Sequence, residues 1–154
     1  MSLRGPAGAV LAAVSLLAAG CGGTPEGGDP GGKRLAELRS DPVFATVPEG
    51  ATLVGQTNTP AKHRDPGFQA GGWAGPSVVL TFKSDGPPED VYGDVARRAE
   101  AAGWKPSAKG SRGVTDRWTK TYPDGAPATL LLAEVGAFAN GDVRYRLSGG
   151  VPPV

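Results

Sequence analysis

Residues Ser77–Gly103 read SVVLTFKSDGPPEDVYGDVARRAEAAG, and this stretch decides the fold. Its first part, Ser77–Lys83, is apolar on both faces near its middle, which is typical of a strand inside a sheet. Its second part, Ser84–Gly103, repeats apolar residues at the spacing of a helix. The stretch therefore predicts a central strand followed by a helix that packs back on the sheet.

The predicted helix has clear start and stop signals. Pro87 and Pro88 open it, because the first turn of a helix needs no backbone N–H donor. Glu89 and Asp90 then lie in the positive first turn, and Gly103 is a natural C-terminal stop. The apolar stripe consists of Val91, Val95, Ala99 and Ala102. We expect this stripe to face the sheet.

Four further segments have the character of strands: Ala51–Thr57, Arg117–Tyr122, Ala128–Val135 and Val143–Ser148. In the last of them the apolar side chains are expected to point inward, with Arg144 and Arg146 pointing outward. Asn140-Gly141 is turn chemistry suited to joining antiparallel neighbours. These segments predict a sheet that is mainly antiparallel.

Two elements are expected before the first strand. Lys33–Arg39 should form a short helix, and Asp41 is a good N-cap residue for a further turn that begins at Pro42. The resulting order, α-β-β-α-β-β-β, predicts an α+β fold. It consists of a small sheet of about five strands with one main helix packed on a face, plus the short N-terminal helix.

The only cysteine of the chain, Cys21, follows an apolar N-terminal segment. Ala7–Ala19 is an uncharged run of 13 residues that comes after Arg4, and a membrane-spanning helix needs about 20. The run ends in LLAAGC, residues 16–21. This arrangement resembles the signal peptide and lipobox of bacterial membrane lipoproteins, and the Ala/Gly/Pro/Arg-rich usage is similar to that of small actinomycete lipoproteins.

The resemblance implies a lipid anchor. Residues 1–20 would be a signal peptide, cut before Cys21 once its sulfur carries diacylglycerol, and two or more acyl chains such as palmitate hold a protein stably. The protein would then lie at the outer leaflet of the cytoplasmic membrane, facing the extracytoplasmic space. The family prefers Leu three residues before the cysteine, where this chain has Ala18. The alternatives are an ordinary secretory cut at the same bond and an uncleaved anchor.

A tether and one domain follow the anchor. Residues 21–32 consist of the lipidated Cys21 and a Gly/Pro-rich linker that cannot bury enough surface to fold. Its ends should lie about 20 Å apart. Residues 33–154 are expected to form a single α+β domain. After removal of the signal peptide, basic and acidic residues balance, so nucleic acid is not an expected partner.

Residue types that carry catalysis or bind metals are sparse. His63 is the only histidine, and with one cysteine the chain offers no His/Cys metal cluster. We interpret His63 as a loop residue rather than a catalytic base. No catalytic residue, metal or cofactor is therefore assigned. Glu134 is expected to form a cross-strand ion pair with Arg144 or Arg146 on the exposed face.

Trp73 is the candidate contact residue for a ligand or partner. It lies in a Gly-rich segment within Lys62–Pro76, which is predicted to be a long loop. One interpretation is an aromatic platform for a hydrophobic or sugar ligand, and the other is an indole that plugs the edge of the sheet.

Three functions are compatible with these features. The first is a non-enzymatic lipoprotein whose open sheet face, or the loop around Trp73, binds an envelope protein or a cell-wall component. The second is a carrier that holds a small apolar or amphiphilic ligand between helix and sheet. The third, less favoured, is a hydrolase that uses a pair of carboxylates. We prefer the first because the residue types that carry catalysis are so sparse.

Overall fold

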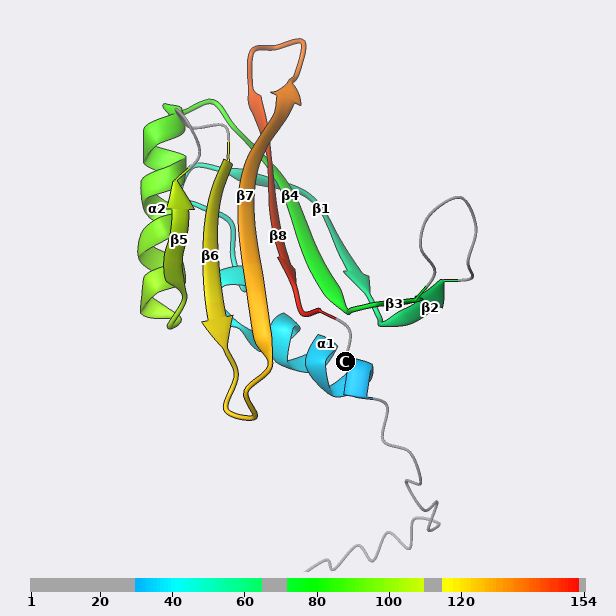
Figure 1. Ribbon diagram of the computed structural model, residues 1–154. Coiled ribbons are helices and arrows are strands. Elements are labelled where there is room, and N and C mark those ends of the chain that lie inside the picture. Colours follow the sequence, from blue (N-terminus) through cyan, green and yellow to red (C-terminus); the bar gives the residue numbers. More distant parts are fainter. Residues whose placement is uncertain (1–29, 65–71, 110–114, 153–154) are drawn as a thin grey trace, which may run out of the picture.

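The computed structural model describes residues 30–64, 72–109 and 115–152 (Figure 1). The predicted signal peptide, Cys21 and most of the linker lie outside the described residues. The described chain is an α+β fold with an antiparallel main sheet, as predicted. That sheet has six strands, so the expectation of about five is wrong by one.

The elements have the following bounds. The helices are α1 (Pro30–Ser40), the short 3₁₀ helix η1 (Pro42–Phe44) and α2 (Pro88–Ala101). The main sheet consists of β1 (Thr52–Thr59), β4 (Ser77–Ser84), β5 (Lys105–Lys109), β6 (Thr115–Thr121), β7 (Pro127–Ala137) and β8 (Val143–Gly150). A separate hairpin consists of β2 (Lys62–Arg64) and β3 (Gly72–Ala74).

The strand order of the main sheet is β1-β4-β8-β7-β6-β5, and every neighbouring pair is antiparallel. Helix α2 carries the chain from β4 to β5 at the far edge of the sheet (Figure 1). The strands β6, β7 and β8 then return one beside the next, so that β8 pairs with both β7 and β4. Segments from before and after the helix therefore meet in the middle of the sheet.

Two elements were not expected from the sequence. Strand β5 has the sequence KPSAK, with a proline and no apolar alternation. It lies at the edge of the sheet, where an unpaired N–H is not needed and proline is tolerated. Within the predicted loop Lys62–Pro76, the strands β2 and β3 pair with each other. Each has three residues, which is too short for a periodic sequence pattern.

The core lies between the helices and one face of the sheet. Helix α2 buries Val91, Val95 and Ala99, which belong to its predicted apolar stripe. From the sheet come alternating residues of four strands: Val78, Leu80, Phe82, Trp118, Ala128, Leu130, Leu132, Tyr145 and Leu147. The ring of Tyr145 stacks on Phe82, with centroids 5.5 Å apart.

The first helical segment packs on the same face through a glycine. Leu38 of α1 and Phe44 of η1 are buried in the core beside Gly149 of β8. A Cβ atom at Gly149 would overlap the ring of Phe44, approaching its Cε2 to 2.9 Å. The absence of a side chain at this position therefore lets the segment approach the sheet closely.

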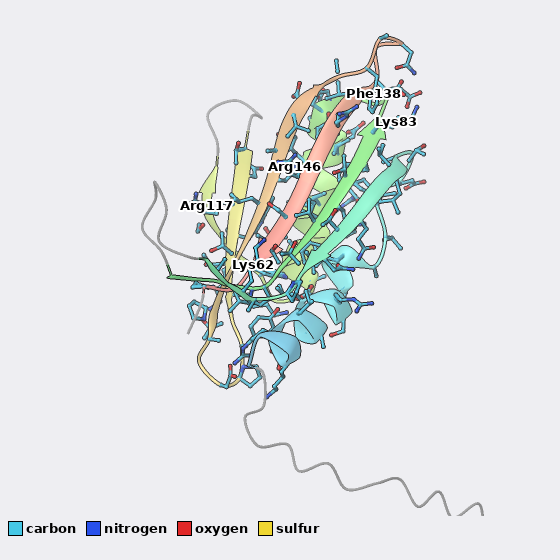
Figure 2. The ribbon with its side chains drawn as sticks, turned by 90° about the vertical axis from the view of Figure 1, so that its right-hand side faces the viewer. Lys62, Lys83, Arg117, Phe138 and Arg146 are labelled. Carbon is cyan, nitrogen blue, oxygen red and sulfur yellow. The ribbon has the colours of Figure 1, made fainter. Side chains whose placement is uncertain are left out.

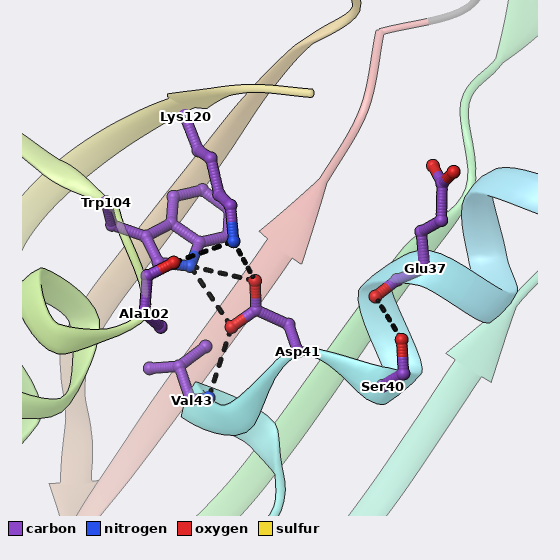
Figure 3. Close-up of polar contacts among 7 residues, drawn as sticks. All are labelled: Glu37, Ser40, Asp41, Val43, Ala102, Trp104 and Lys120. Atoms are coloured by element: carbon purple, nitrogen blue, oxygen red, sulfur yellow. Dashed lines mark hydrogen bonds and ion pairs between the residues drawn. The ribbon is translucent and has the colours of Figure 1, made fainter. Parts of the chain in front are cut away.

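Asp41 joins this segment to the rest of the core (Figure 3). Its carboxylate is 4% exposed and caps η1 by accepting a hydrogen bond from the backbone N–H of Val43 at 3.1 Å. It also accepts from the indole N–H of Trp104 at 3.2 Å and from Nζ of Lys120 at 2.8 Å. Lys120 donates in turn to the carbonyl of Ala102. The predicted N-cap is confirmed, and one buried carboxylate links η1, the end of α2 and β6.

Candidate functional site

One face of the main sheet is not covered by the helices. Along β4 every second side chain is buried under them, whereas the alternate ones, such as Val79 and Lys83, are partly exposed. Directly paired residues of antiparallel strands share a face, so the register extends this division across the sheet. We call the uncovered side the open face, and it is turned toward the viewer in Figure 2.

The register arranges the residues of the open face in rows that cross the strands. The first row holds Thr52, Lys83 and Arg144; the second holds Gly55, Thr81, Arg146, Ala133 and Thr115; the third holds Thr57, Val79, Ser148, Leu131 and Arg117; the fourth holds Thr59, Ser77, Gly150, Thr129, Thr119 and Lys105. Small and hydroxyl-bearing residues predominate. The open face is therefore low and polar, with long side chains only at the basic positions.

The strands give the open face positive charge only. Its charged residues are Lys83, Lys105, Arg117, Arg144 and Arg146. The described strands contain two acidic residues. Asp116 pairs with the buried Leu132 and so lies on the helix side of the sheet. Glu134 pairs with the buried Tyr145 and lies on that side as well.

This register makes one sequence-based prediction wrong. An ion pair of Glu134 with Arg144 or Arg146 requires all three side chains on one face. Glu134 instead pairs with Tyr145, and successive side chains of a strand point to opposite faces. The two arginines that flank Tyr145 therefore lie on the open face, away from Glu134. A bulge between Glu134 and Gly136 shifts the register at this point.

The five cations form a diagonal line across the open face, which we call the cationic stripe. It starts at the end of the sheet near the β7–β8 turn and consists of Lys83 and Arg144, then Arg146, Arg117 and Lys105. Figure 2 shows Lys83, Arg146 and Arg117 following one another along this line. The stripe crosses β4, β8, β6 and β5, so it exists only in the folded sheet.

The first end of the stripe is already occupied by groups of the protein. Nζ of Lys83 donates a hydrogen bond to Asp142 at 2.6 Å. This bond, followed by one from Asn140, holds the pKa of Asp142 below its usual range, so the pair stays ionised at neutral pH. The guanidinium group of Arg144 lies over the ring of Phe138, 4.2 Å from its centroid. Neither cation is the freest contact for a partner.

The other cations of the stripe are available. Arg146, Arg117 and Lys105 are exposed. Among the described residues none of them forms an ion pair. Their charges therefore face solvent without a carboxylate of the protein beside them.

A shallow groove of about 400 Å³ lies beside these cations. Its lining comes from the third and fourth rows and from the segment after β8: Ser77, Val79, Thr129, Leu131, Ser148, Gly149, Gly150, Val151 and Pro152. By register, Arg117 stands next to Leu131 on one side, and Arg146 is two residues from Ser148 along β8. The groove thus has a floor of small side chains with two arginines at its rim.

The β2–β3 hairpin lies on the same side of the molecule. In Figure 2 it crosses in front of the lower part of the sheet, and the exposed Lys62 adds a further positive charge there. His63 and Trp73 are paired opposite each other in this hairpin. For both of them the structure describes the backbone only, so the predicted contact through the indole of Trp73 lies outside the described part. Cys21 lies outside the described residues altogether.

The helix side of the molecule has the opposite charge. A groove of about 600 Å³ near the start of α2 is lined by five carboxylates, together with Arg97 and small residues. These are Glu49, Asp85, Glu89, Asp90 and Asp94. Arg97 donates a hydrogen bond to Asp94 at 2.9 Å. Basic and acidic residues, which balance in number, are therefore segregated to opposite sides of the domain.

Two searches for familiar site types gave no match among the described residues. No group of three or more His, Cys, Asp or Glu side chains is arranged to hold a metal ion within residues 30–64, 72–109 and 115–152. In those same ranges, no helix has the length and apolar character needed to cross a membrane.

Sequence reasoning did not find the cationic stripe. Arg144 and Arg146 were placed outward correctly, but Arg117 was read only as part of a strand. A usable signal is that the outward positions of the predicted strands carry arginine and never a carboxylate. The alignment of Arg117 with this pair depends on the register of three strands, which no local pattern gives.

The chain was compared with known proteins in three ways. No family model matches it, and no curated protein and no solved structure is significantly similar to it.

Proposed function

We propose that this chain is a lipid-anchored, non-enzymatic binding module of the cell envelope. In this proposal residues 1–20 are a signal peptide, Cys21 carries the acyl chains, and residues 21–32 tether the domain through its short N-terminal helix. The domain stands at the outer leaflet of the cytoplasmic membrane and faces the extracytoplasmic space. Its partner is an envelope protein or a cell-wall component, and nucleic acid is not a partner.

The open face is the observation that carries this proposal. Antiparallel sheets commonly expose one face to water, but such a face usually mixes charges of both signs. Here the six strands place cations on it and keep both of their acidic residues on the helix side. A groove lies between these cations and the hairpin that contains Trp73. The surface is therefore suited to binding one kind of partner.

The packing of the core supports this choice over the carrier. A carrier needs space between α2 and the sheet, and that space is the site of a continuous cluster of buried side chains. Val95 and Ala99 of the helix are fully buried, as are Phe82 and Tyr145 of the sheet. The ring of Tyr92 meets that of Tyr145 edge-on at 6.1 Å.

The acidic groove favours the carboxylate-dependent hydrolase as the second candidate. Glycoside hydrolysis commonly needs two carboxyl groups about 5–10 Å apart, and this groove gathers five. Three of them already have structural roles. Glu89 and Asp90 lie in the positive first turn of α2, and Asp94 holds Arg97. The binding module accounts for the charges on both sides of the domain, so we propose it first.

The test is fractionation followed by capture, with the full chain expressed in a lipoprotein-processing bacterium. The wild type should partition into detergent with the membranes and carry a diacylglycerol-modified Cys21 by mass spectrometry. Cys21→Ala should be released in soluble form. The lipidated protein, crosslinked in its own envelope, should then retain a specific component that is lost from a charge-reversed variant, Arg117→Glu/Arg146→Glu.

Two results would contradict the proposal. Equal partition of the wild type and Cys21→Ala would remove the lipid anchor. Capture that is unchanged by the charge reversal would show that the open face is not the binding surface. The matched control is Arg97→Glu on α2, which changes an exposed arginine on the helix side and should leave the captured component unchanged.

A further inference from the structure

The proposed binding module can be assigned a partner class from the chemistry of its open face. The inference rests on the function proposed above and deepens it. Three features have to be matched together: a line of uncompensated cations, a floor of hydroxyl and glycine positions, and a shallow groove beside them.

The charge requires an anionic partner with groups in a line. Neighbouring strands lie about 4.8 Å apart and alternate residues about 6.8 Å apart along a strand. With these spacings the Cα atoms of Arg146 and Arg117 are about 12 Å apart, two strands and one row from each other. Lys105 follows on the next row, two rows and three strands from Arg146. The stripe therefore complements a linear array of negative charges better than a plane of lipid headgroups.

The floor selects among linear polyanions. Nucleic acid strands are bound by stacking their bases on aromatic side chains. In the described part of the open face the aromatic ring is Phe138, and Arg144 already lies over it. Protein partners depend on large apolar and aromatic anchors. The groove instead offers Ser77, Ser148 and Thr129 hydroxyls around Gly150, which suit a partner that is itself rich in hydroxyl groups.

We propose that the open face binds an anionic polysaccharide, with a sugar unit in the groove and its carboxylate or phosphate groups on Arg146, Arg117 and Lys105. Arginine suits this role because its planar guanidinium group donates two parallel hydrogen bonds to a carboxylate or a phosphate. The groove, at about 400 Å³, is within the range of small-molecule sites, about 300–1,000 Å³. Binding is electrostatic in part and weakens as salt is raised.

The test uses the full chain carrying Cys21→Ala, so that lipid does not confuse the measurement. The probes are two anionic polymers, polygalacturonate and poly(glycerol phosphate), with neutral dextran of similar length as the control. Calorimetry should show binding of at least one anionic polymer, weaker binding at higher salt, and none to dextran. Exposed ion pairs contribute little each, so Arg117→Gln/Arg146→Gln should lower the affinity about ten-fold.

Two further variants separate this site from general charge attraction. Arg97→Gln removes an exposed arginine from the helix side and should leave the affinity within about two-fold. Gly150→Leu leaves the charge unchanged but places a side chain in the groove, and it should lower the affinity as much as the double variant. Circular dichroism and urea unfolding of each variant show whether the fold is kept.

The other possible occupants are outcomes that overturn the inference. These are tighter binding to phosphatidylglycerol vesicles than to both polymers, tighter binding to oligothymidylate, or loss of neither polymer in the double variant. Dimers in sedimentation that dissolve in the double variant would instead assign the face to the acidic side of a second copy. If the open-face variants lose the captured envelope component but no polymer binds, the binding module stands and the polysaccharide is wrong.

Discussion

At the scale of single residues, Asp41 has the largest structural role of the described carboxylates. It is removed from water and compensated by hydrogen bonds from the backbone of η1, from Trp104 and from the cation of Lys120. A buried carboxylate is tolerated only when such partners satisfy it. The sequence predicts the capping bond, because Asp41 precedes Pro42. It does not predict the other two, because they come from residues more than sixty positions away.

Replacing Asp41 should destabilise the domain strongly. Asp41→Ala leaves Nζ of Lys120 and the indole N–H of Trp104 without their acceptor, and we expect the free energy of unfolding to fall by about 3–5 kcal/mol. Asp41→Asn keeps one oxygen for the cap and should lose less. The measurement is urea unfolding followed by tryptophan fluorescence. Glu100→Ala, an exposed carboxylate on α2, is the control; a loss as small as that of the control would show that the buried contacts contribute little.

At the scale of elements, the approach of α1 and η1 to the sheet depends on β8. Gly149 and Gly150 are neighbours in this strand, and they point to opposite faces. At Gly149 an added Cβ meets the ring of Phe44 and the side chain of Leu38. At Gly150 it finds only ordinary contacts, with the nearest atom at 3.7 Å.

These two glycines provide a matched pair of variants. Gly149→Ala forces Phe44 or η1 to move, and we expect it to lower the free energy of unfolding by about 1–3 kcal/mol. Gly150→Ala should stay within about 0.5 kcal/mol of the wild type, since its new methyl group is accommodated. Urea unfolding of both variants is the measurement. Equal stabilities would mean that the contact at Gly149 relaxes without cost.

The elements also show where sequence reasoning succeeds. The central strand and helix were predictable because their apolar periodicity reports the burial that β4 and α2 have. Strand β5 was not, because an edge strand is stabilised by pairing with β6 and not by an apolar face of its own. The partner of Glu134 was not predictable either, because the register of β7 against β8 includes a bulge. The open-face groove is a product of that register and has no local signal.

At the scale of the whole molecule, all three tyrosines of the chain are buried in the domain. Burial raises the pKa of Tyr92 to about 12, with a further increase from Glu134. Burial likewise raises the pKa of Tyr122 to about 12, followed by the effect of Asp41. Tyr145 is shifted in the same direction, again mainly by burial, which raises its pKa. The native protein therefore keeps its phenols protonated where an unfolded chain begins to lose them.

This difference predicts an alkaline limit to stability. The folded-state pKa values lie above the unfolded value of about 10, so the stabilisation is complete below pH 10 and is lost as the pH rises through about 12. The loss should amount to roughly 2 kcal/mol for each strongly shifted tyrosine. Tyrosinate absorbance should stay low in the native protein at pH 10.5 and appear when guanidinium is added. A native titration with a midpoint near 10 would contradict the burial of the three rings.

The position of β8 has a consequence for how the protein is made. It is the last strand along the chain, yet it lies between β4 and β7 and joins the two halves of the sheet. Until β8 has left the ribosome, β1 with β4 and β5 with β6 and β7 are separate pieces that lack their common neighbour. Closing so long a loop is slow. A nascent polypeptide of this topology stays threadable during synthesis, which is the state that an export channel for unfolded chains requires.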